Sequence, residues 1–214
     1  MSTEKIFKRL ILLYAGLFIM ACGVAFSIKA SLGTSPISSL PYVVSMVSPL
    51  SVGTATIAMH VVLILLQMII LKKNYRLVQL AQLPIAFLFG WLTDFALWSI
   101  AALPNQSYPV SCLFCIIGIL LVGIGVSFEV NAKLVPLAGE GLILAVCQAW
   151  DRPFPQTKIA FDCTLVLLSV FLSLLTMGTI EGVREGTAFA AVFVGLVSKQ
   201  VTGIVFKHHQ QIEA

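Results

Sequence analysis

A weak internal duplication constrains this chain most, because residues of its first half recur 102 positions later (118 − 16 = 102). At this offset Gly16, Gly23, Val24, Phe26, Ala30 and Leu32 are matched by Gly118, Gly125, Val126, Phe128, Ala132 and Leu134. Duplicated hydrophobic units are typical of secondary transporters, whose substrate site lies between the repeats near the middle of the bilayer. The duplication therefore makes transport the leading hypothesis.

The amino-acid composition indicates whether this chain folds in water or in a lipid bilayer. Hydrophobic residues make up 59% of the chain and charged residues only 10%, and the mean hydropathy is +1.02. Such a chain has too little polar surface for a water-soluble globule, so we predict an integral membrane protein in contact with lipid. The 13 Lys and Arg exceed the 9 Asp and Glu, which is typical of anchored cytoplasmic loops. The sequence contains no basic stripe with interleaved aromatic residues, so nothing in it indicates a nucleic-acid partner.

Hydrophobic segments of two lengths follow one another along the chain. Six are long enough to cross a bilayer, at residues 9–30, 52–71, 77–103, 110–131, 157–178 and 187–206. Two shorter ones, 36–48 and 137–150, follow the first and fourth long segments. Short hydrophobic segments in corresponding places of two halves indicate a transporter's binding site. We predict an all-α polytopic membrane protein with six transmembrane helices and two short re-entrant or broken helices in one membrane domain.

The positions of the basic residues predict how the two repeats are oriented in the membrane. Each repeat, 1–105 and 106–214, has three long segments, and an odd number of crossings inverts the second copy relative to the first. With the N-terminus in the cytoplasm, the cluster of Lys72, Lys73 and Arg76 also lies there. If both short helices crossed the membrane, this cluster would lie outside, against the positive-inside rule. We therefore predict two three-span inverted repeats with both termini in the cytoplasm.

The turn before the first short helix is rich in hydroxyl groups. Its sequence runs Gly-Thr-Ser-Pro-Ile-Ser-Ser over residues 33–39, with a proline suited to the first helical position. Free backbone N–H groups at such a helix end favour an anion. We name Thr34, Ser35, Ser38 and Ser39 as substrate-binding candidates, with an ordinary capped loop as the alternative. The equivalent turn of the second repeat carries Glu140 instead, which is also a substrate-binding candidate.

Arg184 opens the last long segment within a glycine-flanked stretch, residues 181–187. Its planar guanidinium suits carboxylate recognition, so we add it to the substrate-binding candidates. The alternative is an ordinary helix N-terminus, at which the neighbouring acidic residues complement the helix dipole.

Ionisable residues inside apolar segments are costly unless they face a cavity or a partner. Besides Glu140, they are His60, Asp94, Glu129, Asp162 and Lys199, which we name as ion-coupling candidates. His60 matches Asp162 at the offset of 102, and Asp94 matches Lys199 at an offset of 105, so symmetry is expected to bring each pair together. The alternative is a structural pair, which we favour for Asp94 with Lys199, whereas we favour function for Asp162 and Glu140.

Two stretches resemble the YczE/YitT-like family of bacterial integral membrane proteins. They are the Gly-Thr-Ser-Pro turn at residues 33–36 and the stretch 183–191 continuing to Gly195. The resemblance implies a multi-span fold in the bacterial cytoplasmic (inner) membrane, and it supplies no list of site residues.

The leading hypothesis is a secondary transporter of a small polar, anionic metabolite, coupled to protons or Na⁺. One alternative is a substrate-binding membrane subunit that needs a partner ATPase. Another is a non-transporting accessory or sensor protein, or an intramembrane enzyme using Asp162, Glu140 and His60. No phosphate-binding loop, metalloprotease motif or nucleophile elbow occurs in the sequence, so we expect no enzyme, cofactor or metal.

The cysteines and the glycines each allow two interpretations. Cys112 and Cys115 are expected to be small apolar residues, although their spacing also suits a disulfide or a soft metal. The glycines of the first and fourth long segments fit close packing within the chain. They fit a homodimer equally well.

Overall fold

The computed structural model describes residues 3–104 and 107–206, and this part of the chain is helical without strands. Its eight α-helices follow the order long, short, long, long twice. They are α1 (Thr3–Ala30), α2 (Pro36–Val47), α3 (Val52–Leu71), α4 (Gln82–Ser99), α5 (Tyr108–Ala132), α6 (Ala138–Trp150), α7 (Phe154–Met177) and α8 (Glu185–Val201). Short helical turns at Lys72–Asn74 and Leu77–Ala81 precede α4, and one at Thr202–Phe206 extends α8.

Six of these helices are long and apolar enough to cross a membrane. They are the predicted six, with ends shifted by a few residues, so the prediction of an all-α membrane protein is confirmed at this level. The third segment differs most, because α4 ends at Ser99 rather than at 103. Residues 207–214, whose cytoplasmic position is predicted, lie outside the described residues.

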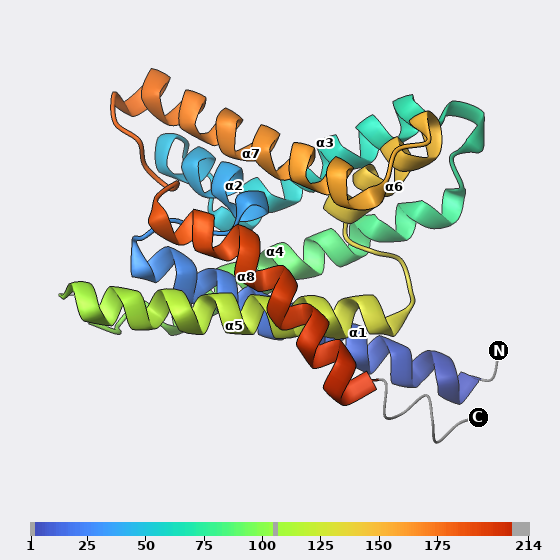
Figure 1. Ribbon diagram of the computed structural model, residues 1–214, viewed down its shortest axis with the longest axis horizontal. Helices are drawn as coiled ribbons and strands as arrows, with labels where there is room; N and C mark the ends of the chain where they lie inside the picture. The colour runs from blue at the N-terminus through green and yellow to red at the C-terminus, as the bar shows by residue number, and fades with distance from the viewer. Residues whose placement is uncertain (1–2, 105–106, 207–214) are drawn as a thin grey trace.

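Helices α1 and α5 form the closest helix pair, and they run antiparallel side by side (Figure 1). Glycines make the close approach possible, with Gly16 facing Gly125 and Gly23 facing Gly118. A Cβ atom at Gly23 would lie only 2.6 Å from the backbone nitrogen of Val122. The glycines therefore serve packing within the chain, as one of the two alternatives predicted.

Helices α4 and α8 pack on this pair, and α2, α3, α6 and α7 lie together on one side of it (Figure 1). Helix α4 packs against α1, and α8 against α5; α2 packs against α7, and α3 against α6. Helix α3 also packs closely against α4, whereas α7 and α8 have very few contacts with each other. Helix α8 is the least buried of the six long helices.

The short helices start near the middle of the molecule and run toward opposite ends (Figure 1). Helix α2 has 12 residues and α6 has 13, so each is about 20 Å long at a rise of 1.5 Å per residue. Neither length crosses about 30 Å of hydrocarbon. Residues of both N-terminal turns, such as Ser35 and Ala138, are buried, so these turns lie inside the helical bundle.

Candidate functional site: a cavity between the short helices

A cavity of about 200 Å³ lies where the first turns of α2 and α6 meet, and all eight helices contribute to its wall. Most of the lining side chains are apolar. The polar and ionisable ones are Ser35, Ser38, Thr56, His60, Glu129, Glu140, Lys158, Asp162 and Ser198. The cavity therefore brings together six of the eleven candidate residues that the sequence indicates, from five different helices and their caps.

Three carboxyl groups from three helices line this cavity, in different environments. Glu129 of α5 is buried, and its Oε1 accepts a hydrogen bond of 2.8 Å from the backbone N–H of Leu137, directly before α6. Asp162 of α7 forms a salt bridge of 3.3 Å with Lys158, one turn earlier on the same helix. Glu140, in the first turn of α6, forms no hydrogen bond or salt bridge with any described residue. One acid caps the start of α6 and one pairs with Lys158, whereas the third has only an electrostatic interaction with Lys158 and no hydrogen bond or salt bridge to the described residues.

His60 projects from α3 toward the same cavity and is only 1% exposed. Its ring stacks on Phe89 of α4, with centroids 6.2 Å apart. Its Nδ1 is buried and has no hydrogen-bond partner among the described residues. A buried polar atom of this kind costs free energy until a partner binds it.

The hydroxyl-rich turn before α2 divides into two pairs. Ser35 and Ser38 line the cavity, and the Ser35 hydroxyl donates to the Ser38 hydroxyl at 3.0 Å. Thr34 and Ser39 are buried away from it. Ser39 donates to the carbonyl of Pro36 at 2.7 Å and bonds with Ser169 of α7 at 2.9 Å. Two of the four predicted hydroxyls therefore do not face the cavity, and one of them, that of Ser39, holds α2 against α7.

Arg184 lies outside the cavity, at the N-terminus of α8. Its guanidinium donates to the carbonyl of Ser31 at 3.1 Å and pairs with Glu185 at 3.4 Å. The backbone N–H of Gly186 donates to the carbonyl of Leu32 at 2.7 Å. Residues 31–35 and 182–187 thus form a docked pair of segments, which we call the loop closure. It joins the two stretches on which the family resemblance was based.

Asp94 and Lys199 do not meet, which corrects the prediction that symmetry pairs them. Asp94 accepts hydrogen bonds from the Gly53 backbone N–H at 2.7 Å and the Ser51 hydroxyl at 2.6 Å, and so caps α3. Lys199 is exposed in the last turn of α8. No salt bridge among the described residues joins them, and neither lines the cavity.

Sequence reasoning missed a pair of buried glutamines. Gln67 of α3 and Gln82 of α4 exchange amide hydrogen bonds of 2.9 and 3.2 Å. Gln67 also donates to the carbonyl of Ala138, the first residue of α6, at 3.1 Å. We call this contact the glutamine closure. The sequence offered a signal for this pair, because polar side chains, like charged ones, are costly inside apolar segments. Lys158 was also missed as a site residue, although it lies four positions before Asp162.

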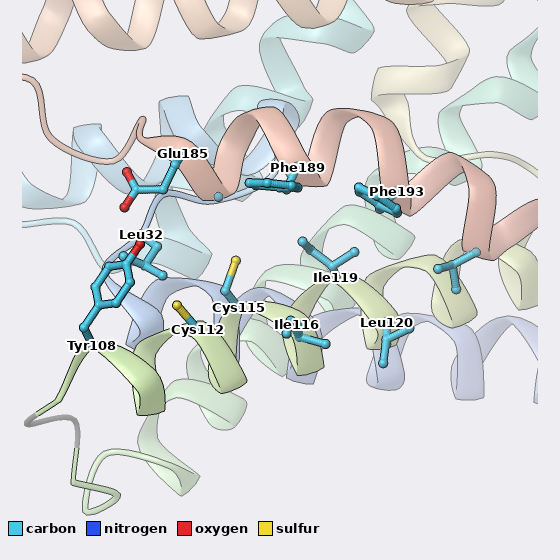
Figure 2. A pocket seen from close by; sticks show the side chains of 12 residues that line it. Leu32, Tyr108, Cys112, Cys115, Ile116, Ile119, Leu120, Glu185, Phe189 and Phe193 are labelled. Atoms are coloured by element: carbon cyan, nitrogen blue, oxygen red, sulfur yellow. The ribbon is translucent and has the colours of Figure 1, made fainter.

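A second hollow is an apolar groove of about 400 Å³ between α5 and α8. Figure 2 shows Cys112 and Cys115 of α5 and Phe189 of α8 along this groove, with Tyr108 and Glu185 at one end. Both cysteines are free thiols, and Cys115 is buried. They therefore contribute to an apolar wall rather than to a disulfide.

Comparison with known proteins places the chain in a family without assigning an activity. An uncharacterized protein of Bacillus subtilis (strain 168), YyaS, is 27% identical over 187 residues, which cover 86% of this chain and 91% of the relative. No solved structure matches. The finer YczE/YitT-like assignment stays a prediction. Because the family model of DUF6198, a family of unknown function, matches residues 7–203, the chain belongs to that family.

Proposed function

We propose that this protein is a secondary transporter of a small polar metabolite, coupled to protons or Na⁺, with its binding site in the cavity. The observation that carries the proposal is the meeting of two short-helix N-termini with buried ionisable side chains. Discontinuous helices whose ends face a central site are a recurring feature of secondary transporters. Ionisable groups retained inside a membrane domain favour a functional role, because they are costly there.

An inverted-repeat architecture, with units 1–105 and 106–214, forms part of this proposal. The helix contacts support it, since α1 with α4 corresponds to α5 with α8, and α2 with α7 corresponds to α6 with α3. The opposite directions of α2 and α6 also support it (Figure 1). We place the protein in the bacterial cytoplasmic membrane with both termini in the cytoplasm, as the basic residues favour.

The cavity has a polar contact toward each end of the molecule, as alternating access requires. The loop closure ties the start of α2 to the start of α8 through Leu32 and Gly186. The glutamine closure ties the start of α6 to α3 and α4 through Gln67 and Gln82. We propose that transport opens one closure while the other stays shut, so that the site is never open to both sides.

The test uses purified protein in proteoliposomes that contain a pH-sensitive dye. Pools of small metabolites are added, and substrate-dependent proton movement is recorded with imposed pH and Na⁺ gradients. We expect a signal that falls in Glu140→Gln and in Asp162→Asn, both of which should still insert into the membrane. Wild-type flux in both variants would remove these residues from the site, and silence across broad pools would contradict transport by the isolated chain.

A second candidate function is a membrane subunit that binds substrate and needs a partner ATPase module. The observation that favours it is the exposed outer surface of α7 and α8, which have few contacts with each other. A partner protein or a second copy of this chain would cover such a surface. This candidate predicts substrate binding, detected as a thermal shift, without flux by the isolated chain.

A further inference from the structure

The ionisable groups of the cavity carry an excess of negative charge. Three carboxyl groups and one lysine line it, which gives a formal charge of −2 when all are ionised and His60 is neutral. The N-termini of α2 and α6 oppose this charge, each equivalent to about half a positive charge. The balance is about −1, which one monovalent cation or one proton neutralises. The hydroxyl-rich turn alone favours an anion, but the carboxyl groups outweigh it.

Glu140 is the acid available to a ligand. The carboxylate of Asp162 is neutralised by Lys158, and that of Glu129 is engaged by the N–H of Leu137. Glu140 has no hydrogen bond or salt bridge to the described residues, and it lies on the cavity wall. Lys158 acts on this carboxylate only through its charge, so an ammonium or guanidinium group would give it a direct hydrogen-bonded partner.

His60 supplies a second, independent indication of a ligand. Its side chain is 1% exposed and lines the cavity, and its Nδ1 has no hydrogen-bond partner in the described part of the chain. A neutral imidazole accepts a hydrogen bond through one ring nitrogen. A bound cation with an N–H group would find in this unpartnered imidazole an acceptor on the cavity wall.

The walls indicate an organic cation rather than a bare metal ion. Phe161 and other apolar side chains line the cavity, and an aromatic ring attracts organic cations through its face; Phe89 also lines it, with one face of its ring covered by His60. A volume of about 200 Å³ is several times the roughly 30 Å³ that one water molecule occupies in the liquid. The space therefore suits a molecule of a few non-hydrogen atoms with an apolar part.

We propose that the cavity binds a small monovalent organic cation in exchange for one proton. This inference rests on the proposed transport function and specifies its substrate class. When the cation binds the Glu140 carboxylate, the proton that neutralised the cavity leaves, so that one positive charge replaces another. The other titratable groups on the cavity wall are His60 of α3, Glu129 of α5, and Lys158 and Asp162 of α7.

The experiment compares permanently charged probes in proteoliposomes that are acidic inside and contain a pH-sensitive dye. The cations are methylguanidinium, which has N–H donors for Glu140 and His60, and choline, whose only donor is its hydroxyl. Isethionate is the matched anion for choline. We expect both cations to drive proton efflux and isethionate to have no effect. Glu140→Gln should lower the cation-dependent rate about tenfold or more, because it removes a charge-assisted interaction. Glu181→Gln makes the same chemical change at an exposed site outside the cavity and should retain the wild-type rate.

The possible outcomes test the substrate class and the transport function independently of each other. Proton movement with isethionate but not with the cations would support transport and overturn the cation assignment. If no probe gives flux, thermal unfolding of the purified protein decides the matter. Stabilisation by cations that is lost in Glu140→Gln would support the cation site and contradict transport, and no stabilisation would overturn the site. On wild-type protein, stabilisation by the cations should weaken as the pH is lowered, because protons compete for the carboxylate.

Discussion

The closest helix contact makes a sharp stability prediction for two glycines in apolar helices. A Cβ atom at Gly23 of α1 would lie 2.6 Å from the backbone nitrogen of Val122 and 2.8 Å from the carbonyl oxygen of Gly118. At Gly195 of α8 a Cβ atom would have no heavy atom within 4 Å. Replacement by alanine makes the same chemical change at both positions. We expect Gly23→Ala to be clearly less stable than Gly195→Ala.

The size of the difference follows from the geometry. Ordinary contacts begin near 3.4 Å, so the Cβ at Gly23 is about 0.8 Å too close (3.4 − 2.6 = 0.8) to backbone atoms. Overpacking of this kind costs about 1–3 kcal/mol. Alanine gains about 1 kcal/mol over glycine in helix propensity, and this gain cancels between the two variants. The free energies of unfolding should therefore differ by about 1–3 kcal/mol.

Thermal unfolding in detergent measures this difference. For a protein of this size, 1 kcal/mol shifts the unfolding temperature by about 2–4 °C. Gly23→Ala should therefore unfold several degrees below Gly195→Ala, which should equal or slightly exceed the wild type. Equal unfolding temperatures, or a higher value for Gly23→Ala, would refute the glycine contact between α1 and α5.

Three further substitutions test the closures and the salt bridge. Gln67→Leu should lower the free energy of unfolding by about 1–3 kcal/mol, because it leaves buried partners without hydrogen bonds; thermal unfolding measures this loss. Gly33→Ala should destabilise the protein more than Gly178→Ala does. Both glycines have positive φ angles, +94° and +70°, but only at Gly33 would the new Cβ also meet neighbouring atoms; equal unfolding temperatures would argue against the loop closure. Asp162→Asn leaves Lys158 without its partner, so the double variant Lys158→Met/Asp162→Asn should recover flux in proteoliposomes. A double variant as inactive as Asp162→Asn would instead assign Asp162 a direct role in coupling.

The sequence predicted the helices well because the bilayer fixes their length. A segment must bury about 20 apolar residues to cross the hydrocarbon, and the six long helices stand out from their connections for that reason. The short helices were found by the same contrast in length. Position 103 was a poor end for the third segment, because hydropathy continues through Ala101 and Ala102 although the α4 helix stops at Ser99.

The candidate site was harder to predict, because symmetry does not imply contact. A two-fold axis brings equivalent residues together only if they lie on the axis. Gly16 accordingly faces Gly125 and not its own equivalent, Gly118. The same reasoning explains why Asp94 and Lys199 remain apart. Which ionisable residues share the cavity depends on how each helix is rotated about its own axis. The offset between the two repeats gives no information on that rotation.

The glutamine closure and the contact between Ser39 and Ser169 lie at equivalent positions of the two repeats but use different chemistry. Ser39 and Ser169 correspond to Gly141 and Gln67 at the offset of 102 (39 + 102 = 141; 67 + 102 = 169). In the first pair two hydroxyls bond directly, whereas at the second a Cβ on Gly141 would press against the side chain of Gln67. The two halves of the chain thus retain the same contacts between α2 and α7 and between α6 and α3 with different chemistry.

The start of α6, where the glutamine closure lies, is also linked to the charge of the cavity. The start of α6 is tied to Glu129, an acid on the cavity wall, through the N–H of Leu137. Hydrogen bonds to an ionised carboxylate are about twice as strong as those to a neutral group, so protonation of Glu129 weakens the hold on α6. Among the described residues the loop closure has no such group, since the ion pair between Arg184 and Glu185 lies outside the cavity. In the transport cycle that we propose, a proton that enters the cavity would favour opening on the α6 side and so supply the bias between two states that coupling needs.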